Sequence, residues 1–126
     1  MTIERIQDRE KFPSNLRGGV VAIGNFDGVH RGHQEVLCQA ATNAKSSSVP
    51  AIALTFEPHP RTFFRSDQPV FRLTEAATKA ELLNHIGFDA VVEHTFDEKL
   101  SSLTAQEFID KVLVEALGVS HVVTGY

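Results

Sequence analysis

Residues 24–33 hold the amino acids of this chain that are best suited to chemistry, Gly-Asn-Phe-Asp-Gly-Val-His-Arg-Gly-His. They follow an apolar run at residues 20–23 and precede a segment with helical periodicity. This pattern predicts a buried strand, a tight glycine-rich turn and the start of a helix. Backbone N–H groups and the dipole at a helix start favour an anion, and imidazoles add donors that titrate near neutral pH. The segment therefore predicts a binding site for a phosphate chain.

Two histidines in this segment, His30 and His33, stand three residues apart with Gly32 between them. We interpret them as a clamp on a phosphate chain and on the transition state of its transfer, because imidazole N–H groups can donate to phosphoryl oxygens as charge shifts. Two alternatives stay open: a polar helix start with two exposed histidines, and a zinc site completed by His59. Gly32 at the expected helix start disfavours zinc, and we predict no metal site in the protein.

The composition is that of a globular protein of one domain, with 126 residues, 42% hydrophobic residues and a net charge of −4. No apolar run reaches roughly 18 residues, no secretory signal is visible, and the basic residues are scattered. We therefore expect a cytoplasmic protein without a membrane segment or a nucleic-acid partner. Cys38 is the only cysteine, and its place in a helical apolar pattern predicts a buried core residue.

Apolar runs alternate with helical patterns along the chain. Strands are expected at 20–25, 50–56, 89–93 and 120–124, and helices at 32–45, 74–86 and 104–117. Because the strands are nearly continuous apolar runs, the alternation predicts an α/β fold, a parallel sheet with helices on both faces. The capping-box pattern at 104–107 is expected to start the last helix, and Gly118 to end it.

The residues suited to chemistry lie where the expected strands end. Residues 24–33 follow the first strand, a proline-rich stretch at 57–70 follows the second, and Gly125 and Tyr126 follow the fourth. In open parallel sheets, ligands bind beyond the carboxyl ends of the strands, where the strand order reverses. We therefore expect three strand ends to converge on one crevice.

The string from Gly24 to Gln34 resembles the signature of prokaryotic FAD synthetases, the bifunctional riboflavin kinase/FMN adenylyltransferases. Further strings carry the same resemblance: Thr-Phe-Glu-Pro-His-Pro at 55–60, Leu73 and Thr74 followed by Lys79, Glu81 and Leu82, and Phe108 followed by residues 121–125. The resemblance as a whole covers about residues 14–126. The resemblance implies a Rossmann-like nucleotidylyltransferase fold.

The activity that this resemblance implies is transfer of AMP from ATP to FMN, which gives FAD and pyrophosphate. The FMN phosphate would attack the α-phosphorus of ATP in line, without a covalent enzyme intermediate. Catalysis would come from positioning of the substrates and from charge stabilisation. The implied ligands are ATP, Mg²⁺, FMN and the product FAD. A related transferase with another phosphorylated acceptor, and a nucleotide-binding module without catalysis, stay open as alternatives.

The resemblance also assigns roles by position. His30 and His33 would be catalytic. ATP binding is implied for Gly24, Asn25, Phe26, Asp27, Gly28, His30, Gly32 and His33. The resemblance implies that the flavin is bound by a loop that contains Phe56, Pro58, His59 and Pro60. Apolar and proline surfaces suit the face of an isoalloxazine ring.

Members of this family continue beyond the position of Gly125, with further strands and a riboflavin kinase domain. We therefore expect residues 1–126 to be an adenylyltransferase domain that is incomplete at its carboxyl end and lacks the kinase domain. We expect such a fragment to be weak or inactive in adenylyl transfer. An open edge at its last strand would favour self-association.

Overall fold

The computed structural model describes residues 3–7, 9–24, 26, 31–57 and 76–124. The chain forms, in order, β1 (Glu4–Ile6), η1 (Arg9–Lys11), η2 (Ser14–Leu16), β2 (Val20–Ile23), α1 (Arg31–Ser46), β3 (Ala51–Glu57), α3 (Ala76–Ile86), β4 (Ala90–Thr95), α4 (Glu98–Ser101), α5 (Ala105–Phe108), η4 (Ile109–Ala116) and β5 (His121–Thr124). The elements η1 and η2 are short 3-10 turns, whereas η4 continues α5 as a π-helix.

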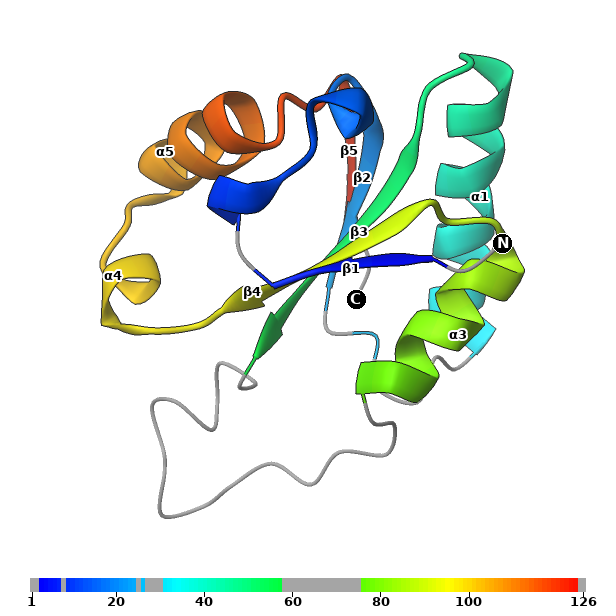
Figure 1. The fold of residues 1–126 in the computed structure, drawn as a ribbon, viewed down its shortest axis with the longest axis horizontal. Helices are drawn as coiled ribbons and strands as arrows, with labels where there is room; N and C mark the ends of the chain where they lie inside the picture. Colours follow the sequence, from blue (N-terminus) through cyan, green and yellow to red (C-terminus); the bar gives the residue numbers. More distant parts are fainter. Residues whose placement is uncertain (1–2, 8, 25, 27–30, 58–75, 125–126) are drawn as a thin grey trace.

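The described strands form one parallel sheet in the order β1-β4-β3-β2-β5 (Figure 1). Val20 of β2 aligns with Ala51 of β3 on one side and with His121 of β5 on the other. The second and the last strands of the chain are therefore neighbours, and the strand order reverses at this point. The predicted parallel α/β sheet is confirmed, and its switch point lies where the glycine-rich segment begins.

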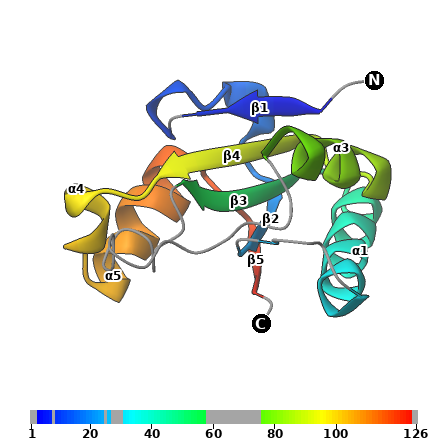
Figure 2. The same ribbon diagram turned by 90° about the horizontal axis from the view of Figure 1, so that it is seen from below.

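Helices cover both faces of the sheet (Figure 2). The pair α1 and α3 packs on one face, and α4, α5 and η4 pack on the other. Each face of the sheet has its own hydrophobic core, and successive residues of a strand point into alternate cores. Val20 and Ala22 face α1, whereas Val21 faces η4. Because both faces are buried, the strands read as continuous apolar runs rather than alternating ones.

The helix predicted at 104–117 begins as expected, with a reciprocal capping box. The Glu107 N–H donates to Thr104 Oγ1 at 3.1 Å, and the Thr104 N–H donates to Glu107 Oε1 at 3.0 Å. At the other end Gly118 has a φ of +57°, and the Val119 N–H reaches the carbonyl oxygen of Leu113 at 3.0 Å. Gly118 thus ends the helix through a left-handed residue that only glycine adopts without strain.

The edge strand β1 is an element that the sequence did not predict. Its Arg5 guanidinium donates to both carboxylate oxygens of Glu93 on β4, at 2.9 and 3.0 Å, and Gln7 Nε2 donates to Glu93 Oε1 at 2.6 Å. Only Ile6 of its three residues is buried. A strand of three residues is too short to show an apolar run in the sequence. The carboxylate that Arg5 binds, on Glu93, lies far from it along the chain.

The expectation that Cys38 is a core residue was wrong, because the Cys38 side chain is exposed on α1. The buried positions of this helix are Leu37, Ala40 and Ala44. Their spacing of three and four residues defines the inward stripe, and Cys38 falls outside it.

Candidate functional site

At the carboxyl end of β2, the side chain of Phe26 packs over Gly24. The Gly24 N–H bonds to the carbonyl oxygen of Leu54 at 3.1 Å, which extends the β2–β3 ladder by one residue. Phe26 has a φ of +53°, which is uncommon for a bulky residue, and its side chain is only 2% exposed in the core under α1 and α3. A Cβ on Gly24 would lie 3.0 Å from two atoms of the Phe26 ring. The ring therefore folds back over Gly24 and uses the space that glycine leaves.

The helix α1 is the next described element after Phe26. The helix begins at Arg31, so the backbones of Gly32 and His33 belong to its first turn. The sequence of that turn contains no acidic residue, and the positive end of the helix dipole there favours an anion. The other residues predicted to bind ATP, Asn25, Asp27, Gly28 and His30, lie outside the described residues.

The ends of three strands meet at this edge of the sheet. Most of the segments that the sequence predicted to form a crevice there, at 24–33, 57–70 and 125–126, lie outside the described residues. Ile23 ends β2, Phe56 lies near the end of β3, and Thr124 ends β5; all three line the same apolar pocket of about 500 Å³. The pocket opens at the carboxyl edge of the sheet on the face that α4 and α5 cover. The convergence follows from the strand order, since β2 lies between β3 and β5.

Three phenylalanines form the aromatic part of this pocket, which we call the phenylalanine pocket. The Phe56 and Phe96 rings meet edge to face, with centroids 5.9 Å apart and planes at 86°. The Phe56 and Phe108 rings are tilted at 50° with centroids 6.4 Å apart. The remaining apolar wall consists of Ile23, Leu100, Leu103, Ala105, Ile109, Leu113 and Val122. Such a cavity suits a flat apolar group.

Side-chain caps start both short helices that line the phenylalanine pocket. Asp97 Oδ1 accepts from the Leu100 N–H at 2.9 Å and starts α4. Thr104 serves the capping box of α5. The pKa of Glu107 is lowered, chiefly because its carboxylate accepts the Thr104 backbone N–H. These caps fix the two short helices that carry the apolar wall.

Sequence reasoning found only part of the pocket. Phe56 was predicted on the flavin side and does line the pocket, whereas Pro58, His59 and Pro60 lie outside the described residues. Phe96 was missed, although it directly follows β4 and the strand-end rule that singled out residues 24–33 applies to it as well. Phe108 lies in a string that resembles the family, but only the fold brings it beside Phe56.

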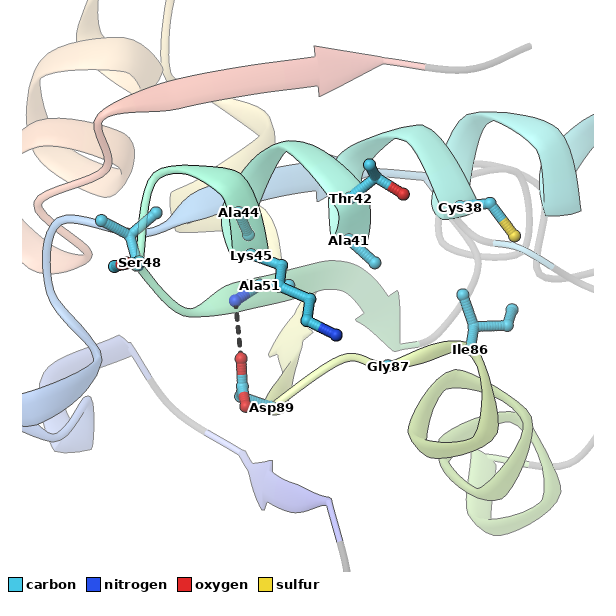
Figure 3. Close-up of a pocket in the computed structure, with 11 residues that line it drawn as sticks. Cys38, Ala41, Thr42, Ala44, Lys45, Ser48, Ala51, Ile86, Gly87 and Asp89 are labelled. Carbon is cyan, nitrogen blue, oxygen red and sulfur yellow. Dashed lines mark hydrogen bonds between the residues drawn. The ribbon is translucent and has the colours of Figure 1, made fainter.

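A second hollow, of about 530 Å³, lies at the opposite edge of the sheet (Figure 3). Lys45 and Cys38 of α1 and Asp89 line it, and Asp89 Oδ2 accepts the Ala51 N–H at 2.8 Å at the start of β3. This edge holds the amino ends of β3 and β4. It is therefore separate from the carboxyl edge of the sheet, where the phenylalanine pocket lies.

In the described part of the chain, no three His, Cys, Asp or Glu side chains gather as a metal site. The zinc alternative joins His33 to His30 and His59, and the latter two lie outside that part. Nor is any helix described here both long enough and apolar enough to cross a membrane.

Comparison with known proteins settles the family. Residues 12–126 match the family model of FAD synthetase. This chain belongs to the FAD synthetase family. It is 44% identical over 109 residues to a bifunctional riboflavin kinase/FMN adenylyltransferase of Pseudomonas fluorescens, a match that covers 86% of this chain and 35% of that protein. A protein of the same description from Escherichia coli K12 is 39% identical over 108 residues, covering 86% and 34% of the two chains.

The FAD synthetase relatives are longer than this chain, which spans about a third of their length. One solved structure, described as a macrolide-efflux protein from Streptococcus pneumoniae, aligns with a TM-score of 0.80 at 25% identity. The alignment covers 98% of this chain and 41% of that one. The shared architecture thus extends over nearly all of the sequence.

The packing of Phe26 on Gly24 yields a prediction. We expect Gly24→Ala to lower the free energy of unfolding by about 1–3 kcal/mol, because the added methyl group overpacks against the ring. In a Phe26→Leu background, the same change is expected to cost clearly less, since the smaller side chain leaves room for it. Urea unfolding followed by circular dichroism measures both values. An equal cost in the two backgrounds would contradict this packing account.

Proposed function

We propose that this chain is the adenylyl-transferring part of an FAD synthetase, which transfers AMP from ATP to FMN and releases pyrophosphate. One observation carries the proposal: the first turn of α1, with His33 in it, and the phenylalanine pocket both lie at the carboxyl ends of the strands around β2. A polyphosphate and a flat apolar ring are the two kinds of group that such neighbouring sites recognise. FMN and ATP together present both.

The proposed transfer is a single in-line displacement. An oxygen of the FMN phosphate forms a bond to the α-phosphorus of ATP while the bond from that phosphorus to the pyrophosphate oxygen breaks. His30 and His33 donate hydrogen bonds to the phosphoryl oxygens as charge moves onto the leaving group. Backbone N–H groups at the start of α1 add fixed positive potential. No protein nucleophile is required.

Mg²⁺ is the metal that this chemistry implies. Within the described ranges no cluster of carboxylates is present to hold a metal alone, and the buried Glu93 carboxylate is already bound by Arg5 and Gln7. Mg²⁺ commonly binds substrate phosphates and keeps several waters, so it fits this chain as a partner of ATP. It would neutralise phosphate charge there.

The phenylalanine pocket is the proposed flavin site. Its volume of about 500 Å³ is in the range of small-molecule sites, and Phe56, Phe96 and Phe108 offer ring faces and edges to an isoalloxazine. Pro58, His59 and Pro60 remain proposed neighbours of the flavin. The same pocket disfavours small polar acceptors, which is why we prefer FMN over another phosphorylated acceptor. Riboflavin kinase activity, named for the longer relatives, is not proposed for this chain.

Replacement of His33 separates catalysis from binding. We expect His33→Ala to lower the rate of FAD formation about 10²- to 10³-fold while the Kd for ATP changes by less than about threefold. FAD would be quantified by chromatography, using residues 1–126 and the longest product of the same reading frame. His85→Ala, on an exposed residue near the end of α3, is the matched control. Weakened ATP binding with an unchanged rate would argue against the proposed role.

Truncation of Phe108 tests the flavin site. We expect Phe108→Ala to weaken FMN binding about tenfold, through lost aromatic contact, and to leave ATP binding unchanged. Quenching of flavin fluorescence during titration measures the first, and calorimetry measures the second. Phe12→Ala is a suitable control, because Phe12 packs on the same core outside the pocket. Equal FMN affinity in Phe108→Ala and wild type would exclude this pocket.

We also infer a cytoplasmic location and self-association of residues 1–126 through β5. Among the described strands β5 pairs only with β2, and Val122 on it is 44% exposed. Its sequence, His-Val-Val-Thr, carries none of the lysines or prolines that protect sheet edges. We expect light scattering to show dimers or larger species that His121→Lys reduces. A monomeric wild type at high concentration would contradict this inference.

A further inference from the structure

A third hollow lies between η4 and the segment that joins β1 to β2, where η1 packs against η4 (Figure 1). We call this cavity of about 510 Å³ the arginine hollow, and it is lined by Arg9, Phe12, Arg17, Lys111, Glu115 and Ala116. Ile109 and Leu113 line the phenylalanine pocket, whereas Lys111 and Glu115 stand two residues further along η4. Because two residues span roughly half a helical turn, the two cavities lie on opposite sides of this helix.

The charged side chains that line the arginine hollow are three cations and one carboxylate. Arg9 belongs to η1, Arg17 directly follows η2, and Lys111 lies on η4 with Glu115. The whole chain has a net charge of −4, so this cavity is positive against the balance of the molecule. A concave surface lined by one sign of charge attracts ligands of the opposite sign. The arginine hollow therefore favours an anion.

Arg17 is held in place by the carboxyl end of η4. Its Nη1 donates to the carbonyl oxygens of Glu115 and Ala116, at 3.0 and 2.9 Å. A Cβ on Gly118 would lie 2.7 Å from Arg17 Cζ, so the guanidinium packs directly against the space that this glycine leaves. The partners are uncharged carbonyl groups, and a guanidinium has more N–H donors than they use. Arg17 thus keeps its positive charge in a fixed position.

Arg9 is positioned by a buried histidine on β4. Because a guanidinium can only donate, His94 Nε2 is the acceptor of the 3.0 Å bond from Arg9 Nη1. The His94 Nδ1–H donates to the carbonyl oxygen of Thr95 at 2.9 Å, so the imidazole is neutral in this arrangement. It orients Arg9 without cancelling its charge. Among the described residues, neither Arg9 nor Arg17 forms an ion pair with a carboxylate.

Lys111 and Phe12 complete the arginine hollow. Lys111 Nζ lies 3.6 Å from Glu107 Oε2, and both side chains are about half exposed. Such a pair contributes little to stability, so the ammonium group can turn to an anion in the hollow. Phe12 is half-buried and packs on the core beside η4, and its remaining surface lines the hollow. The cavity therefore combines a positive rim with an aromatic wall.

We propose that the arginine hollow binds a phosphate monoester that carries a flat ring, at a site separate from the one proposed for adenylyl transfer. Arg9 and Arg17 donate to the phosphate oxygens, a geometry for which guanidinium groups are well suited. Lys111 adds a third positive charge, and the ring of the ligand packs on Phe12. The volume of about 510 Å³ leaves room for a group beyond the phosphate.

The test uses phenyl phosphate as the probe, with inorganic phosphate and phenol as its two halves. Each would be titrated into labelled residues 1–126 in about 0.15 M NaCl, and the backbone amide signals would be followed by nuclear magnetic resonance. We expect saturable shifts at Phe12, Arg17 and Lys111 with phenyl phosphate. Inorganic phosphate should bind there about three- to tenfold more weakly, because it lacks the ring, and phenol should not bind there at all.

Variants identify the groups that bind the probe. We expect Arg9→Gln and Lys111→Gln each to weaken phenyl phosphate binding about five- to tenfold, because each removes a charge-assisted contact. Phe12→Leu should weaken phenyl phosphate binding and leave inorganic phosphate binding unchanged. Lys45→Gln is the matched control, because Lys45 is an exposed lysine of α1, on the other face of the sheet. It should have no effect.

Three results would overturn the proposal. The first is a phenyl phosphate titration that leaves the signals of Phe12, Arg17 and Lys111 unchanged, including one that shifts only the first turn of α1 or the phenylalanine pocket. The second is an equal loss of affinity in Lys45→Gln and Lys111→Gln, which would show attraction to overall charge alone. The third is unchanged affinity in Lys111→Gln, which decides the matter if Arg9→Gln does not fold, since Lys111 is exposed. A chain that forms no FAD leaves this proposal standing, because the arginine hollow takes no part in the proposed transfer.

Discussion

The packing of the Phe26 ring against Gly24 is the constraint on which the rest of the site depends. A bulky residue with a φ of +53° is held by burial in the core under α1 and α3, and glycine leaves the necessary space. This buried anchor sets where the chain leaves β2. Hydrophobic burial of the Phe26 ring thus stabilises a backbone conformation that is itself unfavourable, next to the proposed ligand site.

The two faces of the sheet make different contributions at this edge. On the face of α1 and α3, the start of α1 offers backbone N–H groups and the positive end of a helix dipole. On the face of α4 and α5, three phenylalanines and aliphatic side chains provide an apolar cavity. A ligand pair with a charged chain and a flat ring matches this division. Both contributions lie at the carboxyl ends of the same central strands, because β2 stands between β3 and β5 in the sheet.

The sequence predicted the parts of this molecule that depend on local patterns. The apolar runs predicted the central strands, and the capping box of Thr104 and Glu107 and the stop at Gly118 are confirmed. Long-range pairing was not predictable in the same way. The strand β1 forms because Arg5 meets a carboxylate on β4, and Phe96 reaches the pocket only through the order of the strands. The predicted roles of His30 and the flavin-side loop stay predictions, since those residues lie outside the described ranges.

The most direct test of the central claim is to map both ligands on one labelled sample of residues 1–126 by nuclear magnetic resonance. The account predicts that FMN shifts the signals of Phe56, Phe108 and Val122, that ATP shifts the first turn of α1, and that the hollow around Lys45 and Asp89 is unaffected. The account would be contradicted if FMN shifted the signals of the hollow around Lys45 and Asp89 and left those of the phenylalanine pocket unchanged.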